Sequence, residues 1–233
     1  MTKQTLPFSS PELWEYLSKH SFLSRKHNLL YVSTPKVACT SLKWWFASLE
    51  GYSKKIHQYT DSLETDPDLI IHDVFSKIAP EVTGLPQEKL SEAISSNNYF
   101  SFAVVRNPYE RIFSAWQSKL LLREPLQSEP YWEQDFFWLP VKDIRGMSLA
   151  FEAFLEHLAV YEYPHYWDVH WMPQVTLLRP DLLSYTKIAQ IETLKDLLSM
   201  LSKHLGTCFI NPFVNYTKNK SLIPYSPDFM IPL

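Results

Sequence analysis

The stretch of sequence that decides the fold is NLLYVSTPKVACTSLKWWFASLEG, residues 28–51. It opens with an apolar run rich in branched and aromatic side chains, which predicts a buried strand over residues 28–33. The next apolar run, residues 40–49, has the length of a helix, and Gly51 is a residue type that often ends one. A strand that leads through a short loop into a helix is the repeating unit of α/β proteins, so this class is predicted.

The same alternation continues along the chain. We predict two more strands, over residues 100–105 and 184–191. The predicted helices cover residues 11–19, 86–96, 108–121, 148–158 and 192–205. Ser148 is expected to cap the fourth of them, and the aromatic but aperiodic residues 124–147 are expected to form a long surface excursion. Strands that alternate with helices favour a central, mainly parallel sheet that helices cover on both faces.

Length and composition bound the class of protein. The chain has 233 residues and is 45% hydrophobic, which fits a single domain over residues 1–233, although two small ones would also fit. The net charge of -3 gives no general attraction to polyanions, so nucleic acid is not an expected partner. The two cysteines do not make a disulfide framework. The N-terminus does not resemble a signal peptide, and no window approaches the ~20 apolar residues of a transmembrane helix, so a soluble, cytoplasmic protein is expected.

The loop within the opening stretch, STPKVACTSLK at residues 33–43, has the features of a phosphate site. The N-terminus of a helix offers N–H groups and a positive dipole end to an anion. Small residues let the backbone approach that anion, while Thr40 and Ser41 add hydroxyl donors and Lys36 adds an ammonium group. Both glycines of the Walker pattern GxxxxGK(S/T) are absent, so a nucleoside triphosphate kinase is disfavoured. The alternative interpretation is a helix cap with an incidental lysine.

A second loop of the same kind lies in FAVVRNPYERIFSAWQSKL, residues 102–120. Ligands of open parallel sheets bind beyond the carboxyl ends of the strands, and Arg106 leaves its predicted strand at that end. Pro108 begins the helix that follows. If Arg106 folds back over the first helical turns, its guanidinium group and the Ser114 hydroxyl share one phosphate. The alternative for Arg106 is a surface charge at a strand end.

Together these segments resemble the sulfotransferases that depend on 3′-phosphoadenosine 5′-phosphosulfate (PAPS). The closer likeness is to the carbohydrate group that includes the Golgi enzymes sulfating N-acetylgalactosamine in chondroitin and dermatan. The resemblance rests on PKVACTS at residues 35–41 and VRNPYERIFSA at residues 105–115, in this order. HWMPQ at residues 170–174 and IETL at residues 191–194 are also similar to the family.

The resemblance implies a P-loop-like, three-layer α/β fold and a PAPS donor, which leaves as adenosine 3′,5′-bisphosphate. It implies that Lys36 stabilises the bridging oxygen of the leaving phosphate. It also implies that Arg106 and Ser114 hold the 3′-phosphate, the group that distinguishes PAPS from ordinary adenosine nucleotides. The residues expected to bind the donor are therefore Pro35, Lys36, Val37, Ala38, Cys39, Thr40, Ser41, Arg106 and Ser114. The implied acceptor is a hydroxyl group, in the first place one on a carbohydrate.

The acceptor hydroxyl needs a general base, and the histidines compete for this role. His72, in IIHDVF between the two loops, is the first candidate, because related sugar sulfotransferases often place a histidine base there. His170, in VHWMPQ, is the second candidate and His57 the third. The predicted catalytic residues are therefore Lys36, His72 and His170. For each histidine, a purely structural role is the alternative.

Other interpretations of the chain belong to different classes. A nucleotide-dependent phosphotransferase would need a Walker lysine and a magnesium-binding carboxylate, and the sequence offers no convincing pair. A non-catalytic domain that binds nucleotide or a partner protein would be free to lose loop residues that are intact here. His165, Asp168 and His170 suggest a metal, but the gap between the histidines fits no common ligand spacing, so no metal is predicted. The aromatic residues of 131–138 either stack on a sugar ring or cover the core.

Overall fold

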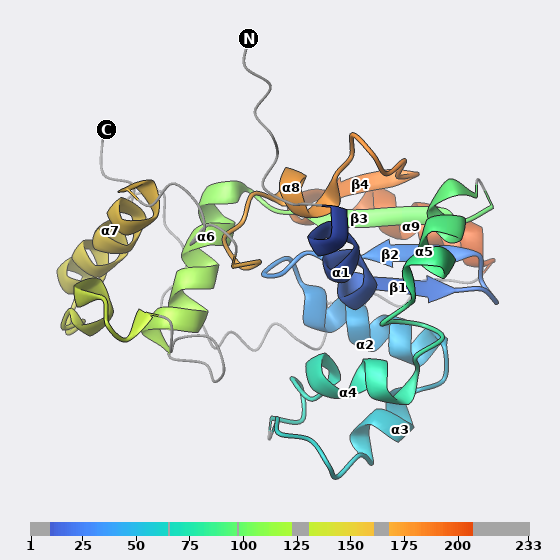
Figure 1. Cartoon of the computed structure of the whole chain (residues 1–233), viewed down its shortest axis with the longest axis horizontal. Helices are drawn as coiled ribbons and strands as arrows, with labels where there is room; N and C mark the ends of the chain where they lie inside the picture. Colours follow the sequence, from blue (N-terminus) through green and yellow to red (C-terminus); the bar gives the residue numbers. More distant parts are fainter. Residues whose placement is uncertain (1–9, 65, 97, 123–130, 161–167, 207–233) are drawn as a thin grey trace. The chain divides into compact units, whose positions relative to one another are not determined.

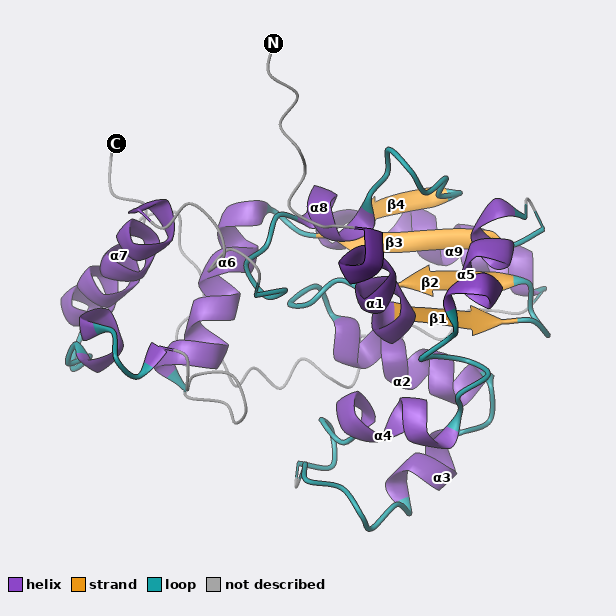
Figure 2. Cartoon of the chain, viewed as in Figure 1, coloured by secondary structure: helices purple, strands orange, loops and turns teal. Residues whose placement is uncertain are grey.

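The structure, a computed structural model, describes residues 10–64, 66–96, 98–122, 131–160 and 168–206 (Figures 1 and 2). The chain divides into two compact units. The first unit comprises Met1–Arg106 with Gln174–Lys218, and the second comprises Asn107–Pro173 with Asn219–Leu233. The expected single domain over residues 1–233 stays a prediction. Within the described ranges, no helix combines the length and the apolar character that crossing a membrane requires.

The first unit is built on a four-stranded sheet, drawn as arrows in Figure 2. In spatial order its strands are β1 (Ser21–Ser24), β2 (Leu29–Val32), β3 (Phe100–Val105) and β4 (Lys187–Gln190). β1 is antiparallel to β2, whereas β2, β3 and β4 are parallel to one another. The three predicted strands are confirmed, and β1 is a fourth that the sequence did not predict. Val32 of β2 pairs with Ala103 of β3, so the two predicted loops leave the same edge of the sheet.

Helices cover both faces of this sheet. The helices of this unit are α1 (Ser10–His20), α2 (Cys39–Leu49), α3 (Ser53–His57), α4 (Ile71–Ile78), α5 (Gln87–Ser95), α8 (Gln174–Leu178) and α9 (Lys195–Leu205). In Figure 1, α1 lies in front of the sheet and α9 lies behind it. The predicted α/β architecture, a mainly parallel sheet between layers of helices, is therefore confirmed. The last helix begins later than predicted, because a 3-10 turn at Ile191–Thr193 precedes it.

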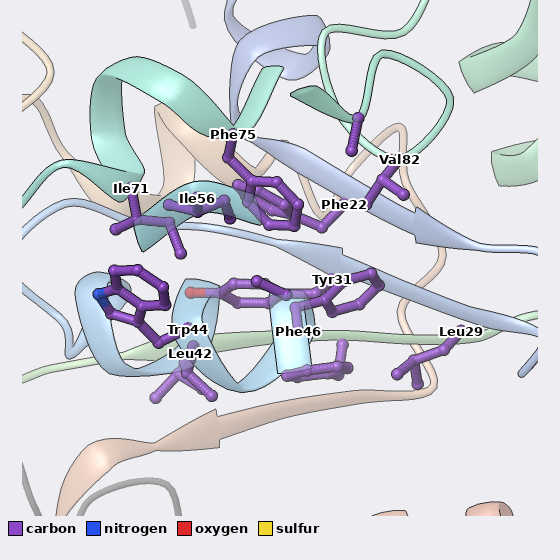
Figure 3. Close-up of a cluster of buried hydrophobic side chains, with 14 of the residues drawn as sticks. Phe22, Leu29, Tyr31, Leu42, Trp44, Phe46, Ile56, Ile71, Phe75 and Val82 are labelled. Atoms are coloured by element: carbon purple, nitrogen blue, oxygen red, sulfur yellow. The ribbon is translucent and has the colours of Figure 1, made fainter. Parts of the chain in front are cut away.

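The core beside α2 follows from the two-residue period of the strands (Figure 3). Leu29 and Tyr31, alternate residues of β2, belong to this cluster together with Phe102 of β3. The rings of Tyr31 and Phe102 stack with their centres 5.0 Å apart. From α2, Trp44 and Phe46 are buried in the same cluster. Because α2 is packed against the sheet in this way, the loop that precedes it is fixed as well.

The described part of the second unit is mainly helical and contains no strand. It contains α6 (Pro108–Trp116), a π-helical turn (Gln117–Leu121), a 3-10 turn (Asp135–Trp138) and α7 (Ile144–Val160). The prediction that Ser148 caps the helix expected over residues 148–158 is wrong, because this helix, α7, begins at Ile144. Asp143 takes the capping role, since its carboxylate accepts the N–H of Gly146 at 2.7 Å. The Ser148 hydroxyl instead donates to the Ile144 carbonyl inside the helix.

The aromatic segment before α7 is largely packed rather than exposed. Tyr131, Phe136 and Phe137 are buried in one cluster with side chains of α6 and α7. These three rings cover the core, so the expected surface excursion is wrong for them. Trp132 and Trp138 remain 52% and 56% exposed. The part of the predicted excursion just before Tyr131 lies outside the described residues.

Candidate functional site

The loop between β2 and α2 holds two residues in the left-handed region of backbone space. Lys36 has a φ of 64° and Ala38 a φ of 50°, and they alternate with Val37 and Cys39, neither of which has a positive φ. Alternating conformations of this kind turn successive N–H groups towards one side and form a concave anion site. A non-glycine residue in such a conformation costs on the order of 1–3 kcal/mol, and this strain gathers at ligand-binding sites. The loop therefore produces, without glycine, a backbone shape suited to a phosphate.

The N-terminus of α2 continues this concave backbone. Ala38 is the N-cap residue, and its methyl side chain makes no capping hydrogen bond. The first-turn N–H groups carry the positive end of the helix dipole. Ser41, in this turn, is 6% exposed, and Thr40 beside it is partly buried. Residues 35–41 thus form one continuous segment at the carboxyl end of β2.

Two buried hydroxyl groups lie at the start of the same loop. Ser33 and Thr34 are each 1% exposed, and neither hydroxyl oxygen has a hydrogen-bond partner among the described residues. A buried polar group left in this state destabilises a fold by about 1–3 kcal/mol. The loop itself is held firmly, because Tyr16 Oη donates to the Ser33 carbonyl at 2.9 Å and Val37 is fully buried. Unsatisfied hydroxyls beside a fixed concave backbone fit a bound group that is rich in oxygen atoms.

His72 lies next to this loop. It belongs to the first turn of α4, and its Nε2 atom is 2.8 Å from the hydroxyl oxygen of Thr40. Its Nδ1 atom is 3.0 Å from Nζ of Lys43. Thr40 and Lys43 are three residues apart on α2, so both groups lie on one face of that helix. The ring of His72 is exposed, which makes it accessible to an acceptor molecule, while its role as a base stays a prediction.

Lys43 is a candidate site residue that the sequence did not single out, and it contacts His72. It is 8% exposed, and its Nζ atom lies 5.6 Å from the centre of the Phe22 ring. Burial lowers the pKa of Lys43, and the interaction with Cys39 opposes this effect. The sequence feature that could have identified Lys43 is its position in an otherwise apolar part of the helix, one turn after Thr40.

Arg106 leaves β3 at its carboxyl end, as predicted, and is partly buried. Its backbone is clamped by Gln174, the first residue of α8. The side-chain amide of Gln174 donates to the Arg106 carbonyl at 2.7 Å and accepts the Arg106 N–H at 2.9 Å. This pair of bonds continues the hydrogen bonding of the strand by one residue. Gln174 lies in HWMPQ, a stretch that the family resemblance marked without giving this glutamine a role.

The second unit begins with the cap of α6. The side-chain oxygen of Asn107 accepts the N–H groups of Tyr109 at 3.0 Å and Glu110 at 3.5 Å. Ser114 lies further along α6 and is partly buried. Arg106 and Ser114 belong to different units, so their joint binding of one phosphate stays a prediction.

His170 lies in a turn of the second unit that Arg111 anchors. Arg111 is 3% exposed, and it donates to the carbonyls of Val169 and Met172, each at 2.7 Å. His170 Nδ1 is 2.7 Å from Oδ1 of Asp168, which also accepts the His170 N–H. A carboxylate in this position favours the proton on Nδ1 and leaves Nε2 as the basic nitrogen. His170 therefore has the local arrangement of a general base, a role that stays a prediction.

The structure gives the remaining described candidate residues no arrangement that suggests a catalytic or metal-binding role. The ring of His57 stacks on Trp44, with ring centres 4.3 Å apart. His165 lies outside the described residues. In the part of the chain that the structure covers, no three histidine, cysteine, aspartate or glutamate side chains are grouped so as to hold a metal ion.

Comparison with known proteins gives one family and a set of relatives. The model of the "Sulfotransferase family" matches residues 19–220. Carbohydrate sulfotransferase 10 of Gallus gallus is 28% identical over 209 residues, which cover 84% of this chain and 54% of the relative. Carbohydrate sulfotransferase 14 of Danio rerio is 27% identical over 201 residues, covering 84% and 51%. The chain thus spans about half the length of these curated relatives, and no solved structure matches it.

Proposed function

The chain belongs to the sulfotransferase family, and from that premise we propose that it transfers a sulfuryl group from PAPS to a hydroxyl group of a carbohydrate. The observation that carries the proposal is the loop between β2 and α2. Its left-handed Lys36 and Ala38 form a backbone suited to an anion, and His72 is hydrogen-bonded to Thr40 beside it. The matched relatives are named carbohydrate sulfotransferases, which supports a carbohydrate as the acceptor.

In this proposal, the two predicted loops hold opposite ends of the donor. Residues 35–41 would bind the 5′-phosphosulfate through backbone N–H groups and hydroxyls. Arg106 and Ser114 would bind the 3′-phosphate, and the clamp from Gln174 would fix the backbone from which the Arg106 side chain extends. The bound donor supplies an activated sulfuryl group, with adenosine 3′,5′-bisphosphate as the leaving group.

Catalysis would come from placed charges and one base. Sulfuryl transfer should resemble phosphoryl transfer, in which negative charge builds on the leaving oxygen. The Lys36 ammonium and the N–H groups of its loop would stabilise this charge. His72 Nε2 would take the proton of the acceptor hydroxyl, exchanging its contact with Thr40 for one with the acceptor. Such a base typically contributes about 10²–10⁴-fold to the rate.

The second unit offers support of its own for a sugar acceptor. The exposed indole rings of Trp132 and Trp138 have the flat apolar faces on which sugar rings stack. His170, oriented by Asp168, is the second candidate for the base. The cytoplasmic location and the exclusion of nucleic acid stay predictions from the sequence.

The test is a transfer assay on the full chain. We expect radioactive sulfate to pass from labelled PAPS to at least one member of a panel of glycans, with the product identified by mass. Lys36→Ala should abolish transfer, whereas Lys54→Ala, on the exposed surface of α3, should leave it unchanged. Phosphate transfer from labelled ATP with magnesium, without any sulfate transfer, would favour a phosphotransferase instead.

A further inference from the structure

The contact between Lys43 and His72 is unusual in its chemistry. Nζ of Lys43 and Nδ1 of His72 are 3.0 Å apart, within hydrogen-bonding distance. Lys43 is 8% exposed, with Phe22 as its neighbour on the sheet side, so its amine is largely removed from water. Among the described residues, no carboxylate forms an ion pair with Lys43.

Two basic nitrogens at this distance cannot both carry a charge without strong repulsion. The pair therefore holds at most one positive charge, and its protons are gained and lost as a coupled system. A hydrogen bond between the two nitrogens needs one donor and one acceptor. Either the Lys43 ammonium donates to Nδ1, or the Nδ1–H of His72 donates to a neutral Lys43 amine.

The two arrangements differ in what they leave at the other ring nitrogen. When the ammonium donates to Nδ1, a neutral imidazole carries its proton on Nε2, and Nε2 has no lone pair for an acceptor hydroxyl. When Nδ1–H donates to the amine, Nε2 is unprotonated and accepts the hydroxyl of Thr40, 2.8 Å away. Only the second arrangement makes Nε2 a base. The protonation of Lys43 therefore decides whether His72 can act.

The surroundings of the pair favour the neutral amine. Burial lowers the pKa of Lys43. From β2, burial raises the pKa of the Tyr31 phenol, which stays neutral. Cys39, one turn earlier on α2, opposes this lowering of the Lys43 pKa, but burial is the larger effect, and on α3 His57 stacks on an indole. On α4, the carboxylate of Asp73 is bonded to Ser62 and Lys77.

We propose that Lys43 is a positioning residue that accepts the Nδ1 proton of His72 and so makes Nε2 the base for the acceptor hydroxyl. This inference rests on the proposed function. In the transfer step, the acceptor O–H bond breaks as the new O–S bond forms, and its proton goes to Nε2. The Nδ1 proton passes to Nζ, so the positive charge ends on Lys43 and the imidazole stays neutral. The bond between sulfur and the bridging oxygen of the 5′-phosphate breaks, its electron pair stays on that oxygen, and adenosine 3′,5′-bisphosphate leaves, so no further reactant is needed.

The first experiment reads the ring protons directly and needs no activity. The ring nitrogens of His72 are followed by ¹⁵N nuclear magnetic resonance against pH, in the full chain without nucleotide. In the wild type, we expect the proton of the neutral ring to move from Nε2 to Nδ1 as the pH rises through the ionisation of Lys43. In Lys43→Met, which keeps an apolar stem over Phe22, we expect no such exchange. The same tautomer in both proteins over the whole pH range would overturn the proposal.

The second experiment is kinetic. Lys43→Met should lower kcat about tenfold or more, with the KM for PAPS unchanged, because the residue acts through the base and not through the donor. The acid limb of its pH–rate profile should move towards the ordinary histidine value of about 6.5. Lys43→Arg should be at least as impaired, because a guanidinium donates a hydrogen bond but cannot accept a proton. Wild-type kcat and an unmoved acid limb in both variants would contradict the pairing.

The matched control is Lys77→Met. It makes the same chemical change on α4, where Lys77 is exposed and pairs with Asp73, the residue next to His72. We expect its kcat and the His72 spectrum to match the wild type. If the wild type transfers no sulfate to any acceptor, the proposed function fails, while the resonance experiment still decides whether Lys43 controls the His72 proton.

Discussion

Ala38 is the residue whose conformation decides what the donor loop tolerates. Its φ of 50° is open to glycine and strained for a β-branched side chain. Ala38→Gly should keep the affinity for adenosine 3′,5′-bisphosphate, because glycine adopts the same left-handed conformation. Its stability should also change little, because relief of roughly 1 kcal/mol of left-handed strain offsets the added freedom of the unfolded chain. Ala38→Val should weaken binding about tenfold or more and lower the melting temperature. Isothermal titration calorimetry on both variants checks this, and equal affinities would contradict the proposed backbone site.

Arg106 is the residue from which we expect nucleotide selectivity. Arg106→Ala should remove the preference for adenosine 3′,5′-bisphosphate over adenosine 5′-monophosphate, because the guanidinium group is the predicted partner of the 3′-phosphate. A lost charge-assisted bidentate contact corresponds to about 1.5–3 kcal/mol, or roughly a tenfold to hundredfold loss of affinity for the bisphosphate alone. Competitive binding measures both affinities, with Arg25→Ala in the exposed turn after β1 as the control. Equal affinities for the two nucleotides in the wild type would defeat the assignment.

At the scale of elements, α8 fixes the end of β3 through one side chain. Gln174→Leu keeps the size of that side chain but removes both bonds to the Arg106 backbone. The free energy of unfolding should fall by about 1–3 kcal/mol, because the N–H and carbonyl groups lose their partners in a partly buried place. Urea titration measures this change. Gln190→Leu, an exposed glutamine at the end of β4, is the control and should change stability by less than about 0.5 kcal/mol.

The same element scale explains why α2 has two functions. Its apolar side, with Trp44 and Phe46, is packed in the core, and its N-terminus ends the predicted donor loop. Thr40 and Lys43 lie on the face turned to α4 and hold the ring of His72 between them. One helix therefore carries the concave backbone and orients the candidate base. A small shift of α2 would disturb both together.

At the scale of the molecule, the sequence predicted what depends on local pattern. The run from Asn28 to Gly51 predicted β2, the loop and α2, because period and punctuation are local properties. Strand β1 was missed, since Ser21–Ser24 is four residues long and has no clear alternation. The cap at Ser148 was wrong because a serine hydroxyl also bonds backwards within a helix, as it does here to Ile144.

In the candidate site, too, local sequence pattern predicted some parts and not others. The donor loop was predictable because its residues are consecutive, whereas the partners of His72 and Arg106 come from distant parts of the chain. Lys43 is 29 residues from His72, and Gln174 is 68 residues from Arg106, so only the packing of α4 on α2 and of α8 on β3 brings them together. Binding of one donor by residues of both units would also depend on residues that are distant in the sequence, so it has to be measured.

Hydrogen exchange measured by mass spectrometry supplies that measurement for the whole molecule. Adenosine 3′,5′-bisphosphate should slow exchange both in residues 33–43 of the first unit and in α6 of the second, because its two phosphates are expected to contact Thr40 and Ser114. Adenosine 5′-phosphosulfate, which lacks the 3′-phosphate, should protect residues 33–43 and leave α6 unchanged. At about 100 times its dissociation constant, the bisphosphate should stabilise the chain by about 2.7 kcal/mol. Equal protection of α6 by both nucleotides would show that Arg106 and Ser114 do not read the 3′-phosphate.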